Sequence, residues 1–179
     1  MIFDLDSFYI DKIHLKEAWN LCDFMVANED RFKDYLPSTL AQNLTPDLSK
    51  RFTEKKVKQF HLKEEFLFTI KEKETHNLAG LVYIKELDWE QKQGEFAYCI
   101  GYQFEGKGLT SKAIQKLSEF AFNDLELNTL QIIVYKDNIG SVKIAKNCNF
   151  IWQKTLPNEF KPAGKQPIDM ELYELYNER

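Results

Sequence analysis

The feature that most constrains this chain is a glycine-bearing turn between a strand pattern and a helix pattern. Residues 94–100 read as a strand, and residues 109–124 carry apolar side chains at helical spacing. Between them, Gly106 and Gly108 allow backbone geometry and a close approach that a Cβ would block. A helix N-terminus presents backbone N–H groups and a positive dipole end to an anion. The turn is therefore interpreted as a cradle for a pyrophosphate.

Length, charge and cysteine content restrict what such a cradle can serve. The chain has 179 residues and a net charge of −4, which predicts a single domain over residues 1–179. A negative balance argues against a general nucleic-acid binder, and no apolar run approaches the ~20 residues of a spanning helix. The first residues of the chain are acidic, whereas a signal peptide begins with a basic segment. The three cysteines are far apart in the sequence, which favours reduced thiols over disulfides. These features predict a cytoplasmic small-molecule protein without nucleic-acid or membrane partners. They do not distinguish a monomer from a homodimer.

The order of patterns along the chain predicts an α+β fold. Hairpin strands followed by strand–helix–strand units favour a sheet of mixed direction. Residues 28–43 are expected to form a loop or a short helical turn, and residues 157–167 a loop. Strands are predicted at 8–15, 66–71, 78–85, 94–100, 130–135, 150–155 and 168–176, and helices at 16–27, 45–60, 109–124 and 141–148.

The predicted helix at 45–60 has a clear start signal and a basic composition. Thr45 can cap the helix, and Pro46 suits its first position. Five cations follow, and a solvated helix face is favoured over a contact for a cofactor phosphate or an acidic substrate. The cations are Lys50, Arg51, Lys55, Lys56 and Lys58.

A nucleotide-binding P-loop is one interpretation of the glycine turn. Gly101-x-x-x-x-Gly106-Lys107 matches most of that pattern, but Gly108 occupies the position where magnesium binding requires a hydroxyl. The hydroxyls of Thr110 and Ser111 are out of register. The preceding strands form a meander rather than the opening of a parallel βαβ domain, so nucleotide triphosphate hydrolysis is disfavoured.

A second interpretation uses Gln103 and motifs further along the chain. Gln103-x-x-Gly106-x-Gly108 resembles the acyl-coenzyme A signature of the GNAT acetyltransferases, Gln/Arg-x-x-Gly-x-Gly/Ala. Residues 98–111 are similar to the RimJ/RimL-type branch that acetylates ribosomal-protein N-termini. Asn138-x-x-Ser141 with Asn149-Phe150 resembles that branch's Asn-x-x-Ser and Gly-Phe, and residues 28–37 resemble it more loosely. The resemblance implies the acyl-CoA N-acyltransferase fold, a mixed, mostly antiparallel central sheet flanked by helices.

The resemblance implies acetyl-coenzyme A (acetyl-CoA) as cosubstrate and no metal. Backbone N–H groups from Phe104 to Thr110 would receive the pyrophosphate, and the strand edge at residues 98–100 would pair with the pantetheine amides. Lys107 is expected to contact solvent or phosphate rather than act as a base. The implied cofactor-binding residues are Tyr98, Cys99, Ile100, Gln103, Phe104, Glu105, Gly106, Lys107, Gly108, Leu109, Thr110, Asn138 and Ser141.

Direct transfer to an amine needs a neutral amine, a polarised carbonyl and a proton for the departing thiolate. Glu95 stands where RimJ/RimL-type enzymes carry a strand glutamate, which implies that it takes the proton of the amine, directly or through water. The alternative is that Glu95 is only an exposed strand carboxylate. Ser141 is the implied thiolate donor but is equally acceptable as a helix N-cap. Asn138 would lie beside the pantetheine or begin a turn. Many GNAT enzymes carry a tyrosine that acts as the general acid at the position of Ala145.

Cysteine chemistry and metal chemistry find less support. Cys99 has no histidine near it in sequence, so a core thiol is favoured over an acyl-carrying nucleophile. The three histidines, His14, His61 and His76, form no ligand spacing. Asn149 in place of the family's glycine is a mild change, because asparagine tolerates left-handed geometry at a helix end.

The prediction is an acetyl-CoA-dependent N-acetyltransferase that modifies a primary amine. A protein or peptide N-terminal α-amine is one acceptor, and a small-molecule amine is another. A non-catalytic acyl-CoA-binding or regulatory module is the alternative, because Ala145 leaves the general acid unassigned.

Overall fold

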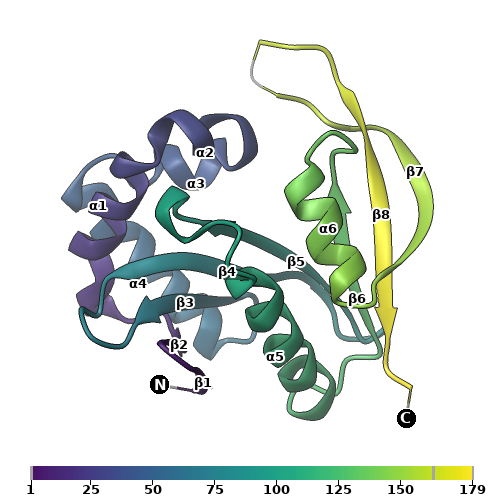
Figure 1. The fold of residues 1–179 in the computed structure, drawn as a ribbon, viewed down its shortest axis with the longest axis horizontal. Helices are drawn as coiled ribbons and strands as arrows, with labels where there is room; N and C mark the ends of the chain where they lie inside the picture. Colours follow the sequence, from purple (N-terminus) through teal and green to yellow (C-terminus); the bar gives the residue numbers. More distant parts are fainter. Residues whose placement is uncertain (1, 163, 179) are drawn as a thin grey trace. The chain divides into compact units, whose positions relative to one another are not determined.

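The computed structural model describes residues 2–162 and 164–178, and Figure 1 labels their α-helices and β-strands. An eight-stranded sheet has the order β1-β2-β3-β4-β5-β6-β8-β7. The pairs β1–β2, β2–β3, β6–β8 and β7–β8 are antiparallel, and β5–β6 is parallel. The predicted α+β class, a mixed and mostly antiparallel sheet flanked by helices, is confirmed. The strands are β1 (Phe3–Leu5), β2 (Phe8–Lys12), β3 (Phe66–Glu72), β4 (Leu78–Asp88), β5 (Gln93–Ile100), β6 (Thr129–Val134), β7 (Ile151–Phe160) and β8 (Ile168–Tyr176); the helices are η1 (Leu15–Glu17), α1 (Ala18–Ala27), α2 (Glu29–Tyr35), α3 (Pro37–Ala41), α4 (Pro46–His61), η2 (Tyr102–Phe104), α5 (Leu109–Asn123) and α6 (Ile139–Asn147).

The chain forms two compact units. The first unit contains residues 1–83 and 98–113, and the second contains residues 84–97 and 114–179. In the first unit, α1 packs against α4, and most side chains of the buried core are apolar, as expected for strands and helices that each bury one face. Its largest fully buried side chains are Ile10, Leu21, Met25, Leu67, Phe68, Ile70 and Leu81. In the second unit, β6 and β7 pair with the two edges of β8 (Figure 1).

The start of α4 follows the predicted capping chemistry. The Thr45 hydroxyl accepts a hydrogen bond from the Leu48 N–H at 3.3 Å, and Pro46 is the first helical residue. Lys56 departs from the predicted basic face. Its ammonium lies 2.5 Å from the Glu65 carboxylate and over the Phe52 ring, and its side chain is 12% exposed. Lys56 is therefore not part of the solvated basic face that was predicted for this helix.

Residues 28–43 are mostly helical, so of the two alternatives predicted for them, a loop or a short helical turn, the loop is wrong. Helices α2 and α3 are both short, with seven and five residues, and neither would be stable alone in water. Burial stabilises them, because Phe32 is 3% exposed and Leu40 is 6% exposed. Tertiary packing therefore stabilises helices in a segment whose sequence shows little helical periodicity.

The predicted boundary of the penultimate strand is also wrong. β7 continues through Pro157 to Phe160, five residues beyond the prediction. β7 lies at the edge of the sheet, where the N–H that proline lacks is not needed for pairing. The short first strand, β1, was not predicted and pairs with β2.

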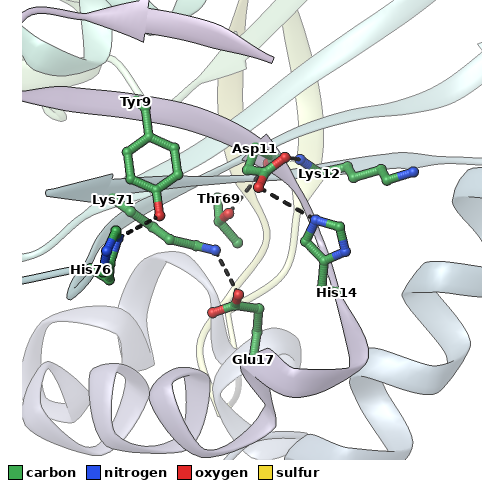
Figure 2. A network of polar contacts seen from close by, with 8 residues as sticks. All are labelled: Tyr9, Asp11, Lys12, His14, Glu17, Thr69, Lys71 and His76. Carbon is green, nitrogen blue, oxygen red and sulfur yellow. Dashed lines mark hydrogen bonds and ion pairs between the residues drawn. The ribbon is translucent and has the colours of Figure 1, made fainter. Parts of the chain in front are cut away.

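A buried ion pair lies within the first unit (Figure 2). The Lys71 ammonium contacts the Glu17 carboxylate at 2.6 Å, and both side chains are 4% exposed. The same ammonium lies 5.8 Å from the centroid of the Tyr9 ring, whose hydroxyl is 3.1 Å from His76 Nδ1. The two charges are therefore removed from water and depend on each other.

We expect Lys71→Met to lower the free energy of unfolding by about 3–5 kcal/mol, because it leaves the Glu17 carboxylate buried without a partner. The double variant Glu17→Met/Lys71→Met should recover most of the loss. Urea denaturation measures both. Lys73→Met, which breaks the exposed pair with Asp4, is the matched control and should change stability far less. A Lys71→Met protein as stable as this control would contradict the prediction.

Candidate active site

The glycine turn lies in the first unit and has buried anchors at both sides. Phe104 is 7% exposed and meets Phe8 edge-on, with ring centroids 5.6 Å apart. Leu109 and Thr110, which open α5, are 4% and 7% exposed. The residues between these anchors, Glu105 to Gly108, are exposed, as is Gln103. The fold thus fixes the sides of the turn and leaves its centre accessible to a ligand.

Gly106 and Gly108 are required by backbone conformation. Both have φ of +70°, in the left-handed region that side-chain-bearing residues rarely adopt. No neighbouring atom lies within 4 Å of the position a Cβ would take at either residue. This open, left-handed turn directly before a helix N-terminus fits a diphosphate.

The neighbouring end of β5 contains the residues predicted to pair with pantetheine. Cys99 is 8% exposed, and burial raises the pKa of its thiol to about 12. The thiol is therefore protonated at neutral pH, which favours the core-thiol interpretation over a nucleophile. The backbone of Gly80 approaches so closely that a Cβ there would stand 2.7 Å from the Cys99 carbonyl oxygen. Lys107 places its ammonium 5.6 Å from the centroid of the Phe104 ring.

Glu95 lies in the second unit, on the part of β5 that pairs with β6. It is opposite Gln131, and its carboxylate contacts the Lys85 ammonium at 2.8 Å. Its side chain is 15% exposed, so the exposed-carboxylate alternative is wrong. Burial raises the pKa of the Glu95 carboxyl above its ordinary value, the Lys85 ammonium opposes the rise, and Glu86 and Glu159 add to it. These are the properties of a carboxylate poised to take a proton.

Asn138 and Ser141 lie at the start of α6, also in the second unit. Asn138 is the N-cap, and its side-chain oxygen accepts a hydrogen bond from the Ser141 N–H at 3.2 Å. The alternative that Ser141 caps this helix is therefore wrong, since helix α6 begins at Ile139. Ala145 is fully buried in the same helix and carries no acid.

The end of α6 explains the asparagine that replaces the family's glycine. Asn149 has φ of +63°, and its N–H donates to the Lys146 carbonyl at 3.1 Å. The Phe150 N–H donates to the Ala145 carbonyl at 3.0 Å, which completes a Schellman motif. Asparagine adopts the left-handed conformation here, as predicted from its residue type.

The structure groups the candidate residues by unit. The glycine turn and the end of β5 belong to the first unit, and Glu95, Asn138 and Ser141 belong to the second. Sequence reasoning missed Lys85, which no motif marked. It also missed Arg31, although the looser resemblance at residues 28–37 pointed to its segment. Among residues 2–162 and 164–178, no group of three or more His, Cys, Asp or Glu side chains could hold a metal ion.

Comparison with known proteins identifies the family. The acetyltransferase (GNAT) domain matches residues 9–151, which is most of the chain. The protein therefore belongs to the GNAT acetyltransferase family, and the predicted class, a GNAT-type N-acetyltransferase, is confirmed at the level of the family. No helix in the described residues is both long and apolar enough to cross a membrane.

Three relatives carry acetyltransferase names. The uncharacterized N-acetyltransferase p20 of Bacillus licheniformis is 31% identical over 60% of this chain, and the match spans only 60% of that relative. A candidate ribosomal N-acetyltransferase, YdaF of Bacillus subtilis (strain 168), is 26% identical over 76% of this chain and 73% of its own length. A spermidine N(1)-acetyltransferase of Vibrio cholerae is 26% identical over 65% of this chain and 66% of its own length.

Solved structures confirm the fold at low sequence identity. The ribosomal-protein-S5-alanine acetyltransferase of Vibrio fischeri superposes with a TM-score of 0.92 at 18% identity, covering 98% of this chain and 96% of that one. A ribosomal L7/L12 α-N-protein acetyltransferase, RimL, in complex with coenzyme A has a TM-score of 0.89 at 13% identity, covering 96% and 95%.

Proposed function

We propose that this protein transfers an acetyl group from acetyl-CoA to a primary amine, with residues 1–179 acting as one GNAT-type domain. The observation that carries the proposal is the turn before α5, where Gly106 and Gly108 both adopt φ of +70°. Its exposed backbone and the adjoining helix N-terminus suit the diphosphate of coenzyme A. The proposed compartment is the cytoplasm. Acetyl-CoA is present there, and its reducing conditions keep cysteines as free thiols.

The diphosphate and the pantetheine arm of the cofactor each have a proposed partner in the chain. Backbone N–H groups from Phe104 to Thr110 would bind the diphosphate, with the Lys107 ammonium adding a charge contact. Backbone groups of Tyr98 to Ile100 would hold the pantetheine amides. The bound cosubstrate supplies an activated acetyl thioester. The residues of the chain orient it and exclude alternative positions.

Proton transfer is assigned to the second unit. The Glu95 carboxylate would take the proton from the acceptor amine, directly or through a water molecule. Lys85 would keep this carboxylate ionised through their 2.8 Å contact. Ser141 would donate a proton toward the departing thiolate, and Asn138 would position Ser141 through the cap of α6.

The acceptor is proposed to be either a protein N-terminal α-amine or a polyamine. The similarity to YdaF supports the first, and the similarity to the spermidine acetyltransferase supports the second. The carboxylates of Glu86 and Glu159 act electrostatically on Glu95, so the surroundings of the proposed base are acidic. An acidic environment favours a cationic acceptor, a property that both candidates share.

A coenzyme A-release assay tests the function. Purified protein with acetyl-CoA is offered peptides that begin with Ala or Ser, the same peptides with blocked N-termini, and spermidine. We expect thiol release with free amines and none with blocked peptides. Calorimetry with acetyl-CoA is run in parallel. Binding without turnover on any amine would favour the non-catalytic module, and absence of binding would overturn the proposal.

A further inference from the structure

The corner between α1 and α2 contacts the start of the glycine turn. Asn28, which is 6% exposed, uses both ends of its side-chain amide. Its nitrogen donates to the Phe24 carbonyl at 2.8 Å, and its oxygen accepts from the Tyr102 N–H at 3.1 Å. One buried side chain thus joins the last turn of α1 to the first residue of η2.

A second contact comes from the first turn of α2. The Arg31 guanidinium donates to the Ile100 carbonyl at 3.4 Å and forms an ion pair with the Glu105 carboxylate. Glu105 lies between Gln103 and Gly106, inside the segment proposed to bind a diphosphate. An unpaired carboxylate there would repel a phosphate, and a bound guanidinium cancels much of that repulsion.

The same corner also packs against Gly101. A Cβ on Gly101 would stand 3.2 Å from the Phe24 ring, and the Gly101 N–H donates to the Ala79 carbonyl at 2.8 Å. Residues 100–105 are therefore held by several contacts, whereas Gly106 and Gly108 meet no neighbour at their Cβ positions.

We propose that Asn28 and Arg31 are positioning residues for the diphosphate-binding turn: Asn28 fixes where the turn begins, and Arg31 neutralises Glu105. The identity of the anion rests on the proposed function, but every contact in the argument lies within the first unit. Neither residue needs to touch the ligand. Their effect on affinity passes through the conformation and the charge of residues 100–105.

A double-mutant cycle tests the charge component, with calorimetry of acetyl-CoA at 50 mM and 500 mM NaCl. We expect Arg31→Met to weaken binding about tenfold at low salt and less at high salt. Glu105→Gln should bind at least as tightly as the wild type, and Arg31→Met/Glu105→Gln should return to within about threefold of it. Lys33→Met, which removes a cation paired with Asp30 on the same helix, is the control and should not change affinity.

Hydrogen exchange of the free protein tests the positioning component independently of the ligand. We expect Asn28→Ala to speed amide exchange at residues 102–108 and to weaken acetyl-CoA binding about tenfold. Asn43→Ala is the matched control, because Asn43 is a second buried asparagine and forms hydrogen bonds with the Thr39 carbonyl and the Ser49 hydroxyl in the same unit. It should lower stability without changing exchange in the turn.

The outcomes separate this inference from the proposed function. The positioning role would be overturned if the wild type binds acetyl-CoA and the Asn28 and Arg31 variants show the same affinity and the same amide exchange as the wild type. The proposed function would then still stand. The charge argument would be overturned if Arg31→Met/Glu105→Gln binds acetyl-CoA as weakly as Arg31→Met does. Wild-type protein that does not bind acetyl-CoA would overturn the proposed function, while faster exchange in the variants would still support the positioning role.

Discussion

Replacing Glu95 with glutamine is expected to lower kcat by about 10²–10⁴-fold, the usual contribution of a positioned general base. Glutamine preserves the size of the side chain but cannot take the amine proton. Acetyl-CoA affinity should change little, because none of the proposed contacts with the diphosphate or the pantetheine uses the Glu95 side chain. Steady-state kinetics with the best amine from the panel, together with calorimetry, measure both effects. Full activity in Glu95→Gln would remove Glu95 from the mechanism.

The pH profile of kcat/KM gives a second readout for the same residue. Burial raises the pKa of the Glu95 carboxyl, so activity should fall, as pH decreases, through a pKa above the ordinary value of a glutamic acid. Deprotonation of an α-amine acceptor adds a second limb to the pH profile near pH 8. The limb from Glu95 therefore appears as additional slope at lower pH. That additional slope should disappear in Glu95→Gln.

Lys85 determines where this limb falls. Its ammonium opposes the rise in the pKa of Glu95, whereas Glu86 and Glu159 increase it. Lys85→Met should therefore move the limb to higher pH, and Lys85→Arg should leave it near its original position. Lys92→Met, which removes an exposed cation from the β4–β5 connection, is the control. A limb that stays in place in Lys85→Met would show that the ion pair does not control the base.

Replacing Gly108 with valine is expected to weaken acetyl-CoA binding by about 10–100-fold, since a β-branched residue at φ of +70° stores roughly 1–3 kcal/mol of strain. The turn would relax to another conformation and lose the alignment of its N–H groups. Gly108→Asn should have a smaller effect, because asparagine tolerates this region. Calorimetry measures the affinity, and thermal unfolding of the free protein checks its folding.

Gly164 provides a matched control for this strain. It has φ of +67° and open space at its Cβ position, but it lies in the connection between β7 and β8. Gly164→Val should therefore introduce similar strain without changing acetyl-CoA affinity. Equal losses of affinity in Gly108→Val and Gly164→Val would mean that the effect is a general destabilisation rather than a property of the turn.

Local chemistry explains which elements were predictable. The start of α4 follows from Thr45 and Pro46, because capping and the fixed φ of proline act within a few residues. The left-handed Asn149 follows in the same way from the conformational tolerance of asparagine. The motif around Gln103 predicted the family, which the comparisons confirm.

Elements that depend on distant packing were predicted only in part, and a loop stayed an alternative for α2 and α3. The helices α2 and α3 are too short to be stable from local propensity and depend on the burial of Phe32 and Leu40. The extension of β7 depends on pairing with β8. The sequence suggested a turn at Asn138 and a helix cap at Ser141, and only the structure showed that Asn138 caps α6.

The sequence by itself determined the family, the fold class and the chemical character of the turn at Gly106 and Gly108. The tertiary structure decided the environment of each candidate group. It placed Lys85 against Glu95, buried the Cys99 thiol, and joined Arg31 to a carboxylate 74 positions further along the chain. Backbone conformation is a local property that residue types encode directly. Desolvation and ion pairing depend on distances through space, which the folded chain alone defines.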